Sequence, residues 1–286
     1  MRNHSWPTVM IVAALAAGCG GGAGPPLVNE VVAVSTAAVP ADPDDAVWRR
    51  APVHLAPLIL QDLVEPRLLV ASTADVRVQA ASDGREIAFR LEWSDPTRDD
   101  TLLPGKFSDA CAVQVPAAPG PDVPAPQMGE PGRAVEISYW RAAWQAVVDG
   151  RGDTVRDLYP GATVDHYPFE AASLAKGSPE QQAMVDRYAP ARALGNHMAG
   201  PRDRPVEDLV SSGPGTLAPA VRSVSSGRGV RTATGWTVVL QRPVPAGFAA
   251  GTRAQVAFAV WEGTHDEAGA RKMRTGWIQL ALEASR

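Results

Sequence analysis

Two runs of alternating apolar and polar residues joined by a tight turn constrain the fold most. From position 87 to position 93, every second residue is Ile, Phe, Leu or Trp, which is the period of a strand with one buried face. The connection at 82–85 contains Asp-Gly, a pair typical of tight hairpin turns. Segments 75–81 and 86–93 are therefore expected to form a β-hairpin.

Further strands are expected along the rest of the chain, separated by clusters of Pro, Gly and Asp. They fall at 53–61, 112–115, 135–140, 236–240, 254–261 and 277–283. Many short strands with Pro/Gly-rich connections are typical of two packed antiparallel sheets. The sequence therefore predicts a mainly β fold, an antiparallel β-sandwich with a few short helices in insertions.

One helix is expected in a long polar insertion. Ser178 can cap its start and Pro179 can occupy its first turn, and the helix should end before Pro190. The surrounding residues 150–204 are irregular and polar, and they separate the two halves of the expected sheet. So long an excursion is expected to serve function or docking rather than the core.

The N-terminus has the pattern of an export signal. Arg2 supplies charge, 9–17 an apolar run, and small residues precede Cys19, which is expected to be lipidated. The alternative is an ordinary secretory signal with an incidental cysteine. We expect a lipoprotein-type signal peptide at 1–18, a flexible tether at 19–45 and one folded domain at 46–286. The protein would then be exported, periplasmic and anchored to the membrane by lipid.

Composition and missing motifs exclude several classes of protein. The formal net charge is −4, and no basic stripe suggests nucleic acid as a partner. Gly-x-Ser-x-Gly, phosphate-loop and His-Glu-x-x-His motifs do not occur, and Cys-x-x-Cys-His, which attaches c-type haem, is missing too. Cys111 is the one cysteine besides Cys19, so we expect it to be buried as a small hydrophobe rather than bridged.

Two residues could carry unusual chemistry. The only lysines are Lys106, Lys176 and Lys272, and the last lies among arginines. A solvated lysine is the ordinary interpretation, but a buried lysine can lose its proton and bind a metal, which arginine cannot. Met128 follows a Pro-rich loop and precedes Gly129, which permits close approach of a planar ligand. The ordinary role of a methionine is to fill a core.

Separated segments share a layout with one known family. They are QMG at 127–129, YWRAAWQ at 139–145, GWTVV at 235–239, VAFAVWEG at 256–263 and RKMRTGW at 271–277, with weaker matches at 107–116, 207–209 and 213–217. This layout resembles the haem b-binding gamma subunits of periplasmic molybdenum enzymes of the DMSO reductase family. That group includes ethylbenzene, dimethyl sulfide, selenate and chlorate oxidoreductases, and the resemblance extends patchily over 47–282.

The resemblance implies a site and a function. In that family a Met and a Lys hold the haem iron, and the matching positions are Met128 and Lys272. Such six-coordinate haem b suits electron transfer, and a Met ligand tends to raise the reduction potential. The chain would not be a catalyst itself. It would carry electrons between a molybdopterin catalytic subunit with its iron–sulfur subunit and a periplasmic cytochrome c.

Other interpretations of the same residues stay open. The protein could be a haem-free β-sandwich lipoprotein that binds a ligand or partner, or a haem sensor or enzyme with an open iron position. His54 is the fallback axial ligand, and 265–267 is a weak candidate metal site. Arg271 and Arg274 could pair with haem propionates. Some of the tryptophans could line a haem pocket rather than the core: Trp140, Trp144, Trp236, Trp261 and Trp277.

Overall fold

The computed structural model describes residues 27–120, 122–152, 154–163, 175, 177–196 and 202–283. Its strands are β1 (Leu27–Val28), β2 (Val31–Ser35), β3 (Val53–Pro57), β4 (Ile59–Leu60), β5 (Asp75–Ser82), β6 (Glu86–Ser94), β7 (Ala110–Pro116), β8 (Val135–Arg141), β9 (Val206–Ser211), β10 (Ala218–Pro219), β11 (Ser226–Arg231), β12 (Gly235–Pro243), β13 (Arg253–Trp261), β14 (Met273–Arg274) and β15 (Ile278–Leu282). Its helices are α1 (Ala142–Val148), α2 (Val155–Leu158), α3 (Pro179–Tyr188) and α4 (Pro190–Ala193), with 3-10 turns at Ala46–Arg49 and Gly263–His265.

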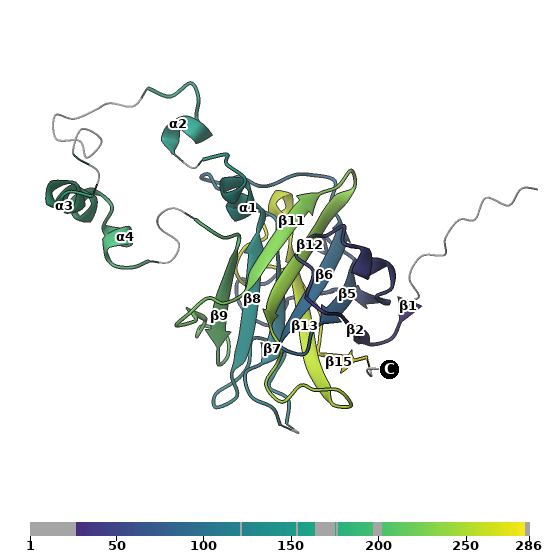
Figure 1. Cartoon of the computed structure of the whole chain (residues 1–286). Helices are drawn as coiled ribbons and strands as arrows, with labels where there is room; N and C mark the ends of the chain where they lie inside the picture. Colours follow the sequence, from purple (N-terminus) through teal and green to yellow (C-terminus); the bar gives the residue numbers. More distant parts are fainter. Residues whose placement is uncertain are drawn as a thin grey trace, which may run out of the picture.

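The strands form one continuous path that folds back on itself at β13. The order is β10-β9-β8-β7-β13-β15-β2-β5-β6-β12-β11. The first half of β13 pairs with β15, and its second half pairs with β7 and β14. Aromatic pairs join the two facing parts: Phe89 packs against Phe258 at 5.9 Å between ring centroids, and Trp140 against Trp236 at 5.2 Å. The predicted mainly β fold is confirmed (Figure 1).

The expected hairpin is present with the expected faces. β5 and β6 pair antiparallel, from Arg77 opposite Glu92 to Ser82 opposite Ile87. The alternating apolar residues of β6 are all buried. Asp83 shapes the turn, because its Oδ1 accepts hydrogen bonds from the backbone N–H of Arg85 and of Glu86 at 2.9 and 2.8 Å. The two-residue alternation therefore identified a core strand correctly.

The N-terminal part of the fold differs from the expectation. β2 lies between β15 and β5 and is parallel to both, so the sheet is mixed rather than wholly antiparallel. Val31, Ala33 and Val34 of β2 are buried. The prediction of a flexible tether as far as residue 45 is therefore wrong for this strand, which the core holds in place. The signal peptide and Cys19 lie outside the described residues.

The helices are short and peripheral. α3 begins as predicted, since the Oγ of Ser178 accepts a hydrogen bond from the backbone N–H of Gln181 at 3.1 Å. α1 was not predicted, because it continues directly from β8 and Arg141 provides no side-chain cap. Figure 1 shows α2, α3 and α4 beside the strands rather than covering them. No helix in the described ranges has the length and apolar character needed to cross a bilayer.

Candidate cofactor-binding site

The outer face of β7 and β13 is hollow because small residues occupy it. On the inner face the two strands present Val113, Val115 and Phe258 to the core. On the outer face, side chains at alternate positions are Ala112, Ala257 and Ala259. These alanines form the floor of a cavity of about 680 Å³. Cofactor pockets commonly have volumes of about 300–1,000 Å³, so this cavity is large enough for a sizeable cofactor.

Aromatic rings wall one end of the cavity. Tyr139 of β8 packs edge-on against Trp261 of β13 at 5.2 Å and against Trp144 of α1 at 5.5 Å between centroids. All three rings line the cavity. Burial raises the pKa of the Tyr139 hydroxyl above its ordinary value. These three rings therefore give this part of the cavity an aromatic wall.

Met128 enters the cavity from a strained turn. Its φ is +70°, in the left-handed region that residues other than glycine seldom adopt. Gly129 follows with φ +81°, and a Cβ there would lie 2.8 Å from the carbonyl oxygen of Arg133. The carbonyl of Met128 accepts a hydrogen bond from the N–H of Gly213 at 2.9 Å. Strain of this kind persists where the surrounding structure enforces it, often at ligand sites.

The side chain of Lys272 reaches the same point from a distant part of the sequence. Its Nζ lies 3.6 Å from the Sδ of Met128 and 5.2 Å from the centroid of the Trp261 ring. The residue is only 9% exposed, and in the described part of the chain no carboxylate forms an ion pair with it. Burial, and then the positive charge of Arg274, lowers the pKa of Lys272 to about 8. A neutral amine is therefore accessible near neutral pH.

The donor set fits haem iron. A thioether and a neutral amine are suitable axial donors, and the apolar walls suit a porphyrin. If haem binds here, Met128 would hold the iron through its Sδ and Lys272 through its Nζ, and the iron would supply one-electron redox chemistry. These two atoms lie 3.6 Å apart. Within the described residues, no group of three or more His, Cys, Asp and Glu is placed to hold a bare ion.

The structure separates the other candidate residues. His54 contacts the carbonyl of Val28 through Nδ1 at 3.0 Å and does not line the cavity, which argues against its role as fallback ligand. His265 pairs with Glu262 and belongs to no metal-binding group in the described ranges. Arg274 lines the cavity, whereas Arg271 lies against the Phe107 ring, 5.9 Å from its centroid.

The tryptophans divide between core and cavity. Trp140 and Trp236 belong to the core, whereas Trp144 and Trp261 line the cavity. Trp277 supports the loop before Met128, since its Nε1 donates to the carbonyl of Pro124 at 2.6 Å.

One end of the cavity carries charged residues that were not predicted from the sequence. Glu207 of β9 lies opposite Tyr139 in register and is 6% exposed. Arg202 pairs with Glu207 at 3.5 Å and stacks over the Trp144 ring at 3.9 Å from its centroid. The sequence did contain one indication of charge at this end. Alternation along β8 places Arg141 on the same face as Tyr139, and both residues line the cavity.

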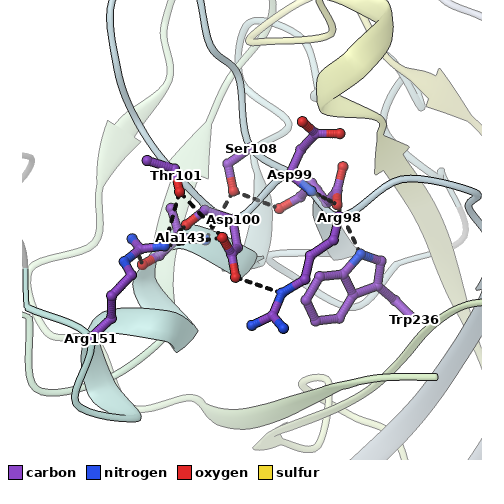
Figure 2. A network of polar contacts seen from close by, with 9 residues as sticks. Arg98, Asp99, Asp100, Thr101, Ser108, Ala143, Arg151 and Trp236 are labelled. Atoms are coloured by element: carbon purple, nitrogen blue, oxygen red, sulfur yellow. Dashed lines mark hydrogen bonds and ion pairs between the residues drawn. The ribbon is translucent and has the colours of Figure 1, made fainter. Parts of the chain in front are cut away.

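A closed polar network fixes the strand ends beyond Trp261. Asp109, just before β7, accepts hydrogen bonds from the N–H of Asp99 at 2.8 Å, the N–H of Gly263 at 2.9 Å and the Nε1 of Trp236 at 2.9 Å. Figure 2 shows this network joined to α1, where the Oγ of Ser108 accepts from the N–H of Ala143 at 2.9 Å. Burial raises the pKa of Asp109 to about 7, although the three donors oppose this. The network holds Gly263, and hence the end of β13, in place.

The buried cysteine also behaves as expected. Cys111 is free and fully buried, on the core side of β7. Burial raises the pKa of its thiol well above the ordinary value. The prediction of a small buried hydrophobe is confirmed.

Fold and site together define a β protein with an apolar cofactor pocket entered by a thioether and an amine. Residues 45–273 match the model of the ethylbenzene dehydrogenase family, and the chain belongs to that family.

Named relatives include subunits of reductases and of a dehydrogenase. The chain is 27% identical over 249 residues to the chlorate reductase subunit gamma of Ideonella dechloratans, covering 84% of this chain and 79% of the relative. It is 28% identical over 172 residues to the dimethylsulfide dehydrogenase subunit gamma of Rhodovulum sulfidophilum, covering 55% of this chain and 61% of that relative. A Haloferax mediterranei protein described as a respiratory nitrate reductase heme subunit is 25% identical over 248 residues, covering 84% of this chain and 68% of the relative.

Among solved structures, the likeness is coarse. A family 9 carbohydrate-binding module from Caldicellulosiruptor kristjanssonii, solved with cellotriose, has a TM-score of 0.39 and 8% identity, covering 90% of this chain and 94% of that chain. A likeness this weak carries no argument about the function.

Proposed function

We propose that this chain binds one haem b, with the Sδ of Met128 and the Nζ of Lys272 as axial ligands to the iron. The observation that carries the proposal is the meeting of these two atoms, 3.6 Å apart, at the wall of the large apolar cavity. They come from segments 144 residues apart. The names of the relatives, one of which is a heme subunit, support the same choice of cofactor.

The proposed function is electron transfer rather than catalysis. Haem iron supplies reversible one-electron chemistry, and two protein ligands would leave no open position for oxygen or substrate. Burial keeps the amine of Lys272 easily deprotonated, so that it can bind the metal. Tyr139, Trp144 and Trp261 give the site an aromatic wall.

The proposal extends to partners and location. Gamma subunits of a chlorate reductase and a dimethylsulfide dehydrogenase are among the relatives. We propose that this chain likewise assembles with a molybdopterin catalytic subunit and an iron–sulfur subunit, and exchanges electrons with a periplasmic cytochrome c. Export and lipid anchoring at Cys19 belong to the same proposal. A Cys19→Ser variant should then appear in the soluble rather than the membrane fraction, and unchanged fractionation would contradict the anchor.

An absorbance experiment tests the haem site. The full chain, purified and supplemented with haem, should show a Soret band at one haem per chain. Carbon monoxide should not bind the reduced wild type, but it should bind the reduced Met128→Ala and Lys272→Ala variants, where one iron position is open. Met184→Ala and Lys106→Ala, which lie outside the cavity lining, are matched controls with unchanged spectra. Carbon monoxide binding to the intact wild type would favour a sensor or enzyme instead.

A further inference from the structure

A second cation faces the cavity beside Lys272. In β14, Met273 points into the core, so its neighbours Lys272 and Arg274 both point to the cavity side. Arg274 is 7% exposed. In register it lies opposite Ala259 of the floor, in one row with Ala112 and Tyr139 across β14, β13, β7 and β8. Arg274 is therefore part of the cavity wall.

The guanidinium of Arg274 is poorly satisfied by the protein. Its Nη1 donates only a long hydrogen bond, 3.4 Å, to the carbonyl of Thr275, and its buried Nε has no partner. Throughout the described ranges, no carboxylate lies within 4.0 Å of it. The negative charge of Asp62 acts on Arg274 from beyond that distance without forming an ion pair, and arginine cannot become neutral by losing its proton. The guanidinium therefore has the capacity to bind a further anion at close range.

The other arginines near the cavity are placed differently, although Arg141 also has a buried Nε without a hydrogen-bond partner. Arg271 lies against the ring of Phe107 and does not line the cavity. Arg141 lines the far end, but it is only partly buried and lies 5.5 Å from the centroid of the Trp144 ring. The carboxylate of Glu207 already occupies that end. A negatively charged group on the ligand is therefore better accommodated at Arg274 than at the Glu207 end.

We propose that Arg274 binds a carboxylate on the edge of the cavity's ligand, which in the haem complex is a propionate. This inference rests on the proposed function and adds the orientation of the ligand within the site. Lys272 and Arg274 are two residues apart, about 7 Å along the strand, so the anion lies beside the axial ligand rather than across the cavity from it. The apolar edge of the macrocycle then faces Tyr139 and Trp261. Arg274 is a positioning residue, since it sets the rotation of the ring and does not touch the metal.

Esterified haem tests the pairing without any mutation. Haem and haem dimethyl ester, whose propionates carry no charge, are titrated into the full wild-type chain and followed by the Soret band. The wild type should bind the ester about 10- to 100-fold more weakly, the range expected for a charge-assisted hydrogen bond. Equal affinity for the two compounds would overturn the proposal.

Variants then assign the effect to one residue. Arg274→Gln should weaken haem binding by a similar factor and leave ester binding unchanged, with the Soret maximum unmoved. Arg274→Lys should restore part of the affinity, and Arg271→Gln is the matched control with wild-type affinity. Loss of affinity in Arg141→Gln instead of Arg274→Gln would contradict the assignment. If the wild type binds neither compound, the proposed haem function itself fails, which is a different result from equal binding of both.

Discussion

The network around Asp109 and the cavity around Lys272 each contain a buried ionisable group. They differ in the hydrogen-bond and ion-pair partners that surround that group. Asp109 accepts three hydrogen bonds from N–H groups on three separate segments. Lys272 meets a thioether and the face of an indole, and has no carboxylate partner in the described part of the chain. Buried polar groups are normally satisfied, so each exception needs an explanation. The protein itself supplies the partners of Asp109, whereas at Lys272 we propose that a bound ligand supplies the partner.

Burial acts on both groups with opposite signs. It raises the pKa of the acid Asp109 to about 7 and lowers the pKa of the base Lys272 to about 8. In each case the charged form is disfavoured. The difference lies in the surroundings, since donors around Asp109 compensate the carboxylate whereas Arg274 adds repulsion at Lys272.

The largest expected effect is on the closed network. Asp109→Ala would leave three buried N–H donors without an acceptor, and each costs about 1–3 kcal/mol. We expect the free energy of unfolding to fall by about 3–6 kcal/mol in a denaturant titration. The control is Asp83→Ala in the exposed β5–β6 turn, which should cost less than about 1 kcal/mol. Equal losses in the two variants would mean that the Asp109 network is not a structural anchor.

At Lys272, in contrast, removing the charged group should stabilise the haem-free protein. Because its pKa falls from 10.5 to about 8 on folding, the unfolded chain binds more protons between these values, and stability rises with pH there. The rise should reach about 3 kcal/mol at most. Lys272→Met should remove it and be the more stable protein at pH 7.

Denaturant titrations of the apo protein at several pH values between 7 and 10.5 measure this difference. Lys106→Met is the control, because Lys106 is exposed. If the free energy of unfolding changes with pH in the same way in the wild type and in Lys272→Met, the lowered pKa of a buried Lys272 is contradicted.

Filling the alanine floor should separate binding from folding. Ala112→Phe places a ring in the cavity, so we expect haem affinity to fall about 100-fold, or about 2.7 kcal/mol. The free energy of unfolding should change little, because the new ring enters open space. Haem titration and denaturation measure the two effects, with Ala41→Phe on the surface as control. Undiminished haem binding by Ala112→Phe would place the ligand elsewhere.

The smallest effect concerns the turn that presents Met128. Gly129 and Gly132 have nearly the same φ, +81° and +82°, but only at Gly129 would a Cβ meet backbone atoms. Gly132→Ala should cost about 1 kcal/mol for its backbone conformation. Gly129→Ala should cost about 1–2 kcal/mol more and also weaken haem binding. The melting temperature of each variant, with and without haem, measures this, and equal shifts would show that the turn tolerates displacement.

The fold was predictable where local pattern and packing agree. The β5–β6 hairpin followed from strict alternation and an Asp-Gly turn. β11 was missed because Ser226–Arg231 reads SGRGVR, which has no alternation. β2 was missed because a Gly/Pro-rich stretch precedes it and its partners lie far along the chain. Parallel pairing between distant segments leaves no local signal.

The site was predictable only in part. Met128 and Lys272 were selected through the resemblance, and the structure brings them together, although their role as iron ligands stays a prediction. Nothing in the sequence distinguished Arg274 from Arg271, because the cavity-facing side of β14 depends on its register with β13. The alanine floor could not be predicted either, because its members come from two strands far apart in sequence and meet only through the register of these strands.

Reduction of the haem-loaded full chain in the presence of carbon monoxide tests the central claim most directly. With the sulfur of Met128 and the nitrogen of Lys272 both on the iron, one haem should bind per chain and the spectrum of the reduced protein should not change when the gas is added. A protein that shows no Soret band after haem supplementation, or whose reduced spectrum shifts at once under carbon monoxide, would contradict this account.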